Sequence, residues 1–142
     1  MSSALDRLKN LTAKISSYEV ARKENMKLLK ALYEQLLITD KVENFPDLFH
    51  FKAINLSGVS LSDESLGEIK EGKYLQIIAI IYDREAKVKN RNISLGYFGR
   101  AEKVDPIRVN EIVAFVLRWR FEKSFMTLEH HHTMIGTLKS SA

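Results

Sequence analysis

The stretch KYLQIIAIIYDREAKVKNRNISLGYFG, from Lys73 to Gly99, decides the fold of this chain. It holds two β-rich runs, residues 74–82 and 92–98, on either side of a polar segment, and this pattern predicts a β-hairpin. Successive side chains of the first run point to opposite faces of the strand, and both faces are apolar. A strand of this kind needs a cover on each face. We therefore expect helices, a second sheet or a partner chain on both sides of the sheet.

Length and composition restrict the class of protein. The chain has 142 residues, of which 45% are hydrophobic, and this is enough for one domain with an ordinary core. It has no cysteine, which excludes disulfides and thiolate metal sites and suits a reducing compartment. No apolar run reaches membrane-spanning length, and the N-terminus lacks a secretory signal. These features predict a cytoplasmic or otherwise intracellular protein with no membrane partner.

The N-terminal segment predicts one long helix, because no glycine or proline occurs before Pro46. Apolar residues recur on it at a heptad spacing that favours pairing with another helix, as in a coiled coil. We expect residues 1–40 to form an oligomerising helix. The apolar heptad positions, called the heptad stripe below, are Leu8, Leu11, Ile15, Tyr18, Leu29, Leu32 and Leu36.

A second interpretation of this helix is that its apolar face lies on the sheet of its own domain. Roughly 34 residues make a helix about 50 Å long, which overhangs a typical strand of about 17–20 Å, and the overhang favours a partner. Arg22 and Asn25 interrupt the heptad stripe. They either fix the register of an oligomer as buried polar residues, or lie in water while the stripe drifts past them.

Residues 41–127 are predicted to form a small α+β domain. A first strand is expected near residues 48–56, with Pro46 at its start. Asp105 and Pro106 are typical of a helix start, and the apolar stripe that follows predicts a helix from Pro106 to Met126. Residues 128–142 are predicted to be a flexible tail. The predicted fold class is α+β, with the long coiled-coil-like helix, a three-stranded antiparallel sheet and a C-terminal helix packed on the sheet.

Residue types that carry chemistry are present without a recognisable arrangement. His130, His131 and His132 are adjacent, so their side chains diverge, and they lack the helical spacing of a zinc site. Acidic residues are scattered rather than paired in a motif for acid–base catalysis. We therefore expect neither an enzyme nor a cofactor or metal site.

Basic residues around the hairpin give the alternative function. The net charge is +4, and it is divided into +3 over residues 1–38, −4 over 39–83 and +5 over 84–142. A basic β-ribbon can contact phosphates of a nucleic acid, or an acidic protein partner. The residues that would make this contact are Arg84, Lys87, Lys89, Arg91, Arg100 and Lys103.

Taken together, these features predict a non-enzymatic structural or interaction protein. It would self-associate as a homo-oligomer through its N-terminal helix and contact a protein partner within a larger assembly. The alternative is a nucleic-acid-binding protein that uses the basic hairpin between Arg84 and Lys103.

Overall fold

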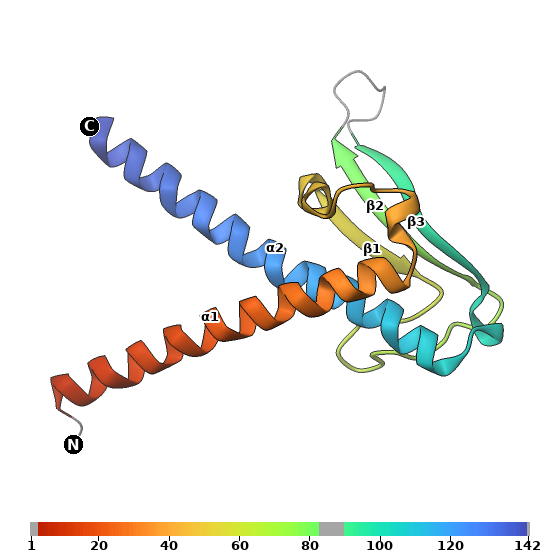
Figure 1. Ribbon diagram of the computed structural model, residues 1–142, viewed down its shortest axis with the longest axis horizontal. Helices are drawn as coiled ribbons and strands as arrows, with labels where there is room; N and C mark the ends of the chain where they lie inside the picture. The colour runs from red at the N-terminus through yellow and green to blue at the C-terminus, as the bar shows by residue number, and fades with distance from the viewer. Residues whose placement is uncertain (1–2, 83–89, 142) are drawn as a thin grey trace.

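The computed structural model describes residues 3–82 and 90–141, without the side chains of residues 12–17, 90 and 139–141. It has an α+β fold with a three-stranded antiparallel sheet and a C-terminal helix, as predicted (Figure 1). Three short 3₁₀ helices, η1 (Ile38–Asp40), η2 (Phe45–His50) and η3 (Ala101–Lys103), connect the larger elements. The larger elements are α1 (Ala4–Gln35), β1 (Ala53–Ser57), β2 (Tyr74–Tyr82), β3 (Asn90–Arg100) and α2 (Pro106–Ser141).

The sheet has the order β1-β2-β3, so the predicted hairpin strand β2 lies in the centre. Its register places Ile78 between Asn55 of β1 and Ser94 of β3. The register shifts at two places along β2 and β3, and β3 supplies the extra residue each time. Gly99, at one of these shifts, has a φ of +88°, a conformation that glycine adopts without steric cost.

One face of the sheet is covered and the other is open. Leu75, Ile77 and Ala79 are fully buried in a single hydrophobic core that includes residues of α1 and α2. On the opposite face Tyr74 and Tyr97 are exposed, with ring centroids 5.9 Å apart. Within the described part of the chain only one face therefore has a covering layer, and cover of the second face by a partner chain stays a prediction. Both long helices pack on the same face of the sheet, so neither helix covers the opposite face (Figure 1).

The first strand begins later than predicted. Pro46 lies in the first turn of η2, where its missing N–H is not needed, and the strand starts only at Ala53. Phe45 and Phe49 of this segment pack in an aromatic cluster instead of on a strand face. Phe49 stacks on Trp119 of α2 at 6.4 Å, and the indole N–H of Trp119 donates to the carbonyl oxygen of Leu48 at 2.8 Å.

Helix α2 starts where the sequence predicts and ends much later. The Asp105 carboxylate accepts the N–H of Ile107 at 2.8 Å, which caps the start. The predicted end at Met126 is wrong, because the helix continues to Ser141, and the flexibility of this end stays a prediction. Residues 127–135 hold neither glycine nor proline, and their Thr127 and Thr133 hydroxyls donate to carbonyl oxygens four residues earlier.

Basic side chains of α2 bind the edge strand and the segment before it. The Arg120 guanidinium donates to the carbonyl oxygen of Ile54 at 3.1 and 3.2 Å and to the Asn55 side chain at 3.0 Å. The Lys123 ammonium donates to the carbonyl oxygen of Phe49 at 2.6 Å. Because β1 lies at an edge of the sheet, the bonds of Arg120 to Ile54 occupy a backbone carbonyl that another chain could otherwise pair with.

Candidate interaction surface

The predicted heptad stripe of α1 is divided into a covered part and an exposed part. Leu29 and Leu36 are buried in the core, and Leu32 packs against it. The structure thus places these three residues against their own domain rather than on an open helix face. Leu8 and Leu11 are 60% and 56% exposed, while the side chain of Ile15 lies outside the described residues.

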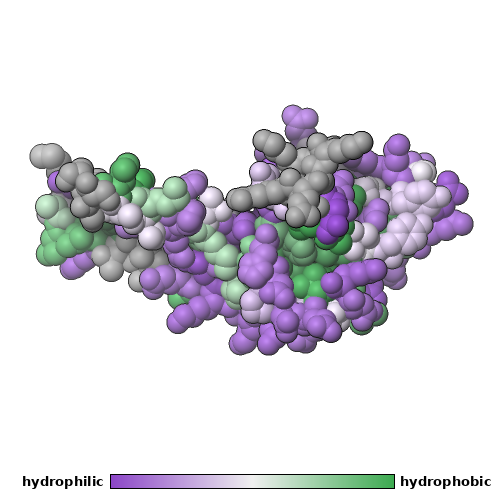
Figure 2. All heavy atoms as spheres, turned by 90° about the horizontal axis from the view of Figure 1, so that it is seen from above, coloured by the Kyte–Doolittle hydropathy of each residue, from purple (hydrophilic) through white to green (hydrophobic). Residues whose placement is uncertain are grey.

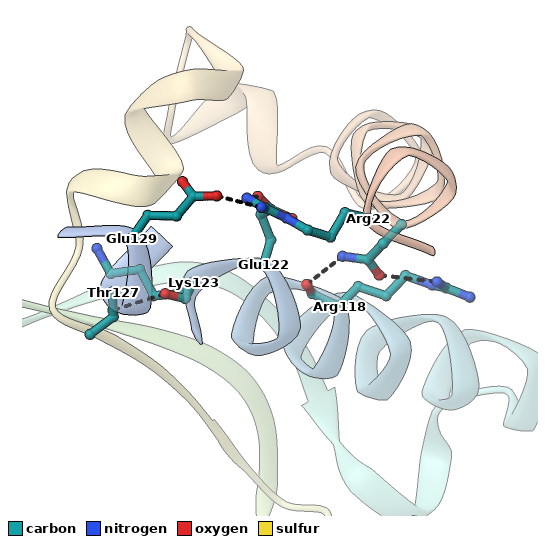
Figure 3. Close-up of polar contacts among 7 residues, drawn as sticks. Arg22, Arg118, Glu122, Lys123, Thr127 and Glu129 are labelled. Carbon is teal, nitrogen blue, oxygen red and sulfur yellow. Dashed lines mark hydrogen bonds and ion pairs between the residues drawn. The ribbon is translucent and has the colours of Figure 1, made fainter. Parts of the chain in front are cut away.

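The two parts meet where α1 crosses α2, and a charged network holds this crossing (Figure 3). The Arg22 guanidinium donates to Glu122 at 2.7 Å and to Glu129 at 2.5 Å. The Glu122 carboxylate is almost fully buried. Its hydrogen bond, followed by that of Glu129, raises the pKa of Arg22 because both favour the charged guanidinium. The network therefore keeps a buried carboxylate paired with a permanent positive charge.

Asn25 adds an uncharged link to the same crossing. Its side chain is buried and donates to the carbonyl oxygen of Arg118 at 2.9 Å, while the Arg118 guanidinium donates back to the Asn25 amide oxygen at 3.1 Å (Figure 3). Both interpretations of the interruption at Arg22 and Asn25 need correction, since both side chains are engaged within the chain itself. They bind the second helix of the same chain.

Aromatic side chains of both helices also pack at the crossing. The rings of Tyr18 and Phe125 lie 6.0 Å apart, and the Arg22 guanidinium lies 4.8 Å from the centroid of Phe125. Phe121 and Phe125 meet edge to face at 5.0 Å. Among the described residues of the heptad stripe, Tyr18 is the one nearest the N-terminus whose ring contacts α2.

Beyond the crossing both helices project away from the sheet and diverge (Figure 1). We call residues 4–17 the α1 arm and residues 127–141 the α2 arm. A capping box fixes the start of the α1 arm: the Ser3 hydroxyl accepts the N–H of Asp6 at 3.1 Å, and the Asp6 carboxylate accepts the N–H of Ser3 at 3.3 Å. Apolar residues gather at the end of the molecule where the two arms project (Figure 2).

Sequence reasoning missed the α2 arm as an apolar surface. The tail prediction treated these residues as irregular, yet the arm is helical and carries four exposed apolar side chains. The signal that could have found it is the seven-residue spacing of Phe121, Leu128 and Ile135. The four side chains are Leu128, Met134, Ile135 and Leu138.

The predicted basic cluster at the hairpin is not brought together among the described residues. Arg84, Lys87 and Lys89 lie outside them. Arg91 and Arg100 stand near opposite ends of β3, roughly 30 Å apart for nine extended residues, with Lys103 beyond Arg100 in η3.

Arg100 is also already engaged in an ion pair, at 3.3 Å from Glu102. The pKa of the Glu102 carboxyl is lowered by a hydrogen bond from the backbone N–H of Glu102 itself. The backbone N–H of Gly72 and the charge of Arg100 lower it further. This acid is thus held in its charged form beside one of the predicted contact residues.

The histidines do not form a ligand set within the described residues. His130, His131 and His132 are exposed on the α2 arm, and no cluster of three or more histidine, aspartate or glutamate side chains could hold a metal ion there. No described helix is both long and apolar enough to cross a membrane. The chain matches no protein-family model, no curated protein and no solved structure.

Proposed function

We propose that this chain is a non-enzymatic structural or interaction protein that self-associates through its α1 arm within a larger assembly. The observation that supports the proposal is the exposure of Leu8 and Leu11 at heptad positions of a helix that projects away from its domain. A helical face of this kind is unfavourable in water and is typical of helices that pair with another helix.

The contact length available on α1 is set by the crossing. From Tyr18 onward the stripe faces α2 or the core of the same chain, so a second copy can pair only with residues 4–18. This segment is about 22 Å long, or roughly four helical turns. The pairing would resemble a short coiled coil that stops where Arg22 binds Glu122.

The energy of this contact can be estimated from its leucines. Burying one fully exposed leucine contributes about 1.5–3 kcal/mol, so Leu5, Leu8 and Leu11 of two copies would contribute roughly 5–10 kcal/mol, given that each is more than half exposed. Association itself costs about 4–15 kcal/mol in lost translational and rotational freedom. The α1 arm therefore supplies a specific contact whose energy is close to the cost of forming it.

The test is a matched pair of single substitutions on α1. Leu11→Lys places a charge on the heptad stripe, and Val20→Lys places the same charge on the opposite side of the helix, where Val20 is 67% exposed. Light scattering over a range of protein concentrations should give a mass above one chain for the wild type and for Val20→Lys. Leu11→Lys should fall toward the mass of one chain.

Trp119 serves as the folding control, because its indole is buried in the core and far from either substitution in the chain. All three proteins should share one tryptophan emission spectrum. A wild type that stays monomeric at high concentration would contradict the proposal. An unchanged oligomer of folded Leu11→Lys would do so as well.

A further inference from the structure

Helix α2 carries a second apolar stripe, which begins at the crossing and continues along the α2 arm, a quarter to a third of a turn around the helix from the side that faces α1. Leu117 and Phe121 lie at its start, and Leu128 and Leu138 on the arm are 64% and 72% exposed. At about 100° per residue, Leu117, Phe121, Leu128 and Ile135 fall within about 40° of one another, with Leu138 beside them. We call this set of five residues the α2 stripe.

The exposed part of this stripe lies on the arm, where Leu128, Ile135 and Leu138 are each more than half exposed. Near the crossing the stripe is partly covered, since Phe121 packs edge to face on Phe125. Among the residues of α2 that contact α1, Arg118, Glu122, Phe125 and Glu129 lie about 80–140° around the helix from the centre of the stripe. The core-facing residues, such as Val116 and Trp119, lie on a third side. A helix that has already buried two of its sides within its own fold thus keeps a further apolar side in water.

The size of the arms indicates that both are needed for a stable contact. An arm about 22 Å long and 10 Å across buries roughly 350 Å² when half of its surface is covered. A stable interface takes about 800 Å² from each partner. One arm from each copy gives less than half of that area, whereas two arms from each copy come close to it.

Formal charge favours a particular pairing of the arms. The α1 arm carries Asp6 against Arg7, Lys9 and Lys14, which gives +2, and the α2 arm carries Glu129 against Lys139, which gives zero. Packing two α1 arms on each other would bring +2 against +2. Packing an α1 arm on the α2 arm of another copy avoids this repulsion.

We propose that the occupant of the α2 stripe is the α1 arm of a second copy, so that two copies related by a twofold axis form one four-helix bundle from their four arms. The inference rests on the proposed self-association and adds the second helix and its partner. Such a bundle is isologous, and the two α1–α2 contacts in it are identical by symmetry.

The first experiment adds charge to the α2 stripe. Leu128→Lys with Ile135→Lys should raise the dissociation constant of the dimer by roughly a hundredfold, because both charges enter an apolar contact. The control is His130→Lys with Thr133→Lys, which places the same lysines on the other side of the same arm, where both residues are exposed. This control should keep the wild-type mass.

The outcomes separate the inference from the proposed function. If the α2 double variant remains a dimer while Leu11→Lys is monomeric, self-association through α1 stands and the bundle is wrong. If the wild type is monomeric, both fail. If the α2 double variant dissociates and its control does not, the bundle is supported.

Disulfide trapping identifies the pairing even if the lysine variants fail to fold. The chain has no cysteine, so single introduced cysteines report unambiguous contacts. A mixture of Leu11→Cys and Ile135→Cys proteins, one lengthened by a tag, should give the mixed disulfide faster than either protein alone gives its own. Preferential formation of the Leu11→Cys homodimer would overturn the α1–α2 pairing in favour of α1 against α1.

Discussion

The two halves of helix α1 carry the same heptad pattern and have opposite surroundings. Leu29 and Leu36 are buried in the core of the chain, whereas Leu8 and Leu11 stand in solvent on the α1 arm. The difference teaches that a heptad pattern identifies which face of a helix is apolar and leaves open what covers it. In this chain the cover changes along one helix, from its own domain to the proposed second copy.

The border between the halves is polar. Arg22 and Asn25 occupy heptad positions, and both bind side-chain or backbone groups of α2. A pattern of apolar residues cannot show this, because the partners Glu122 and Arg118 lie about a hundred positions further along the chain. Each of the following changes tests how sharply the two halves differ.

The largest expected effect is the contrast between Leu29→Ala and Leu11→Ala. Emptying a fully buried leucine site should lower the free energy of unfolding by about 2–5 kcal/mol. The exposed Leu11 site should change the stability of the isolated chain by less than about 0.5 kcal/mol. Urea unfolding followed by Trp119 fluorescence measures both.

Protein concentration sharpens this contrast. Any effect of Leu11→Ala should appear only at concentrations where copies associate, because an oligomer is stabilised by mass action. The effect of Leu29→Ala should not depend on concentration. Equal losses of unfolding free energy for the two variants in dilute solution would contradict the proposed division of α1 into a core half and an exposed arm.

The next effect is at the border itself. Asn25→Ala removes two hydrogen bonds at the crossing, the one to the carbonyl oxygen of Arg118 and the one from the Arg118 guanidinium, and this should cost about 1–3 kcal/mol of unfolding free energy. Lys23→Ala, on an exposed neighbour, is the control. If Asn25→Ala costs no more than its control, then the polar link does not hold the crossing.

The smallest effect distinguishes two tyrosines of the same helix by pH. Tyr33 is buried and its hydroxyl donates to the carbonyl oxygen of Val42, and burial raises its pKa. A raised pKa gives stability that is present below the pKa of the unfolded chain, about 10, and is lost as pH rises through the folded value. Tyr33→Phe should cost about 1 kcal/mol at neutral pH and reduce the loss of stability in alkali.

Tyr18→Phe is the matched control, since Tyr18 lies at the border and its ring is about half exposed. Urea midpoints measured across the alkaline range should differ from the wild-type profile for Tyr33→Phe alone. A wild-type profile in the Tyr33→Phe protein would show that the buried hydroxyl is not the group responsible.

The sequence predicts the hairpin and the start of α2 well because both depend on local chemistry. The β-branched run of β2 and the pair Asp105 and Pro106 determine their own conformation. The wrong first strand shows the limit of such reasoning. Phe49 and Phe51 alternate as in a strand, but Phe49 stacks on Trp119, a residue that no local pattern connects to it.

The candidate surface was predictable only in part, for the same reason. Periodicity identifies Leu8 and Leu11. Leu128 and Leu138 lie in a polar, histidine-rich end for which composition predicts a frayed tail, so it does not identify them. Which leucines face the core is decided by tertiary packing of α1 against α2, since the heptad spacing treats Leu11 and Leu29 alike.

The crossing of α1 and α2 has a mechanical consequence. Each arm acts as a lever of about 22 Å whose pivot is the contact of Arg22 with Glu122 and of Asn25 with Arg118. A rotation of about 10° at this pivot moves the tip of an arm by about 4 Å, which is the full length of a side-chain contact. A few polar bonds at the pivot thus set the angle between the two arms. A substitution there would change the direction in which both arms project without changing any residue at their tips.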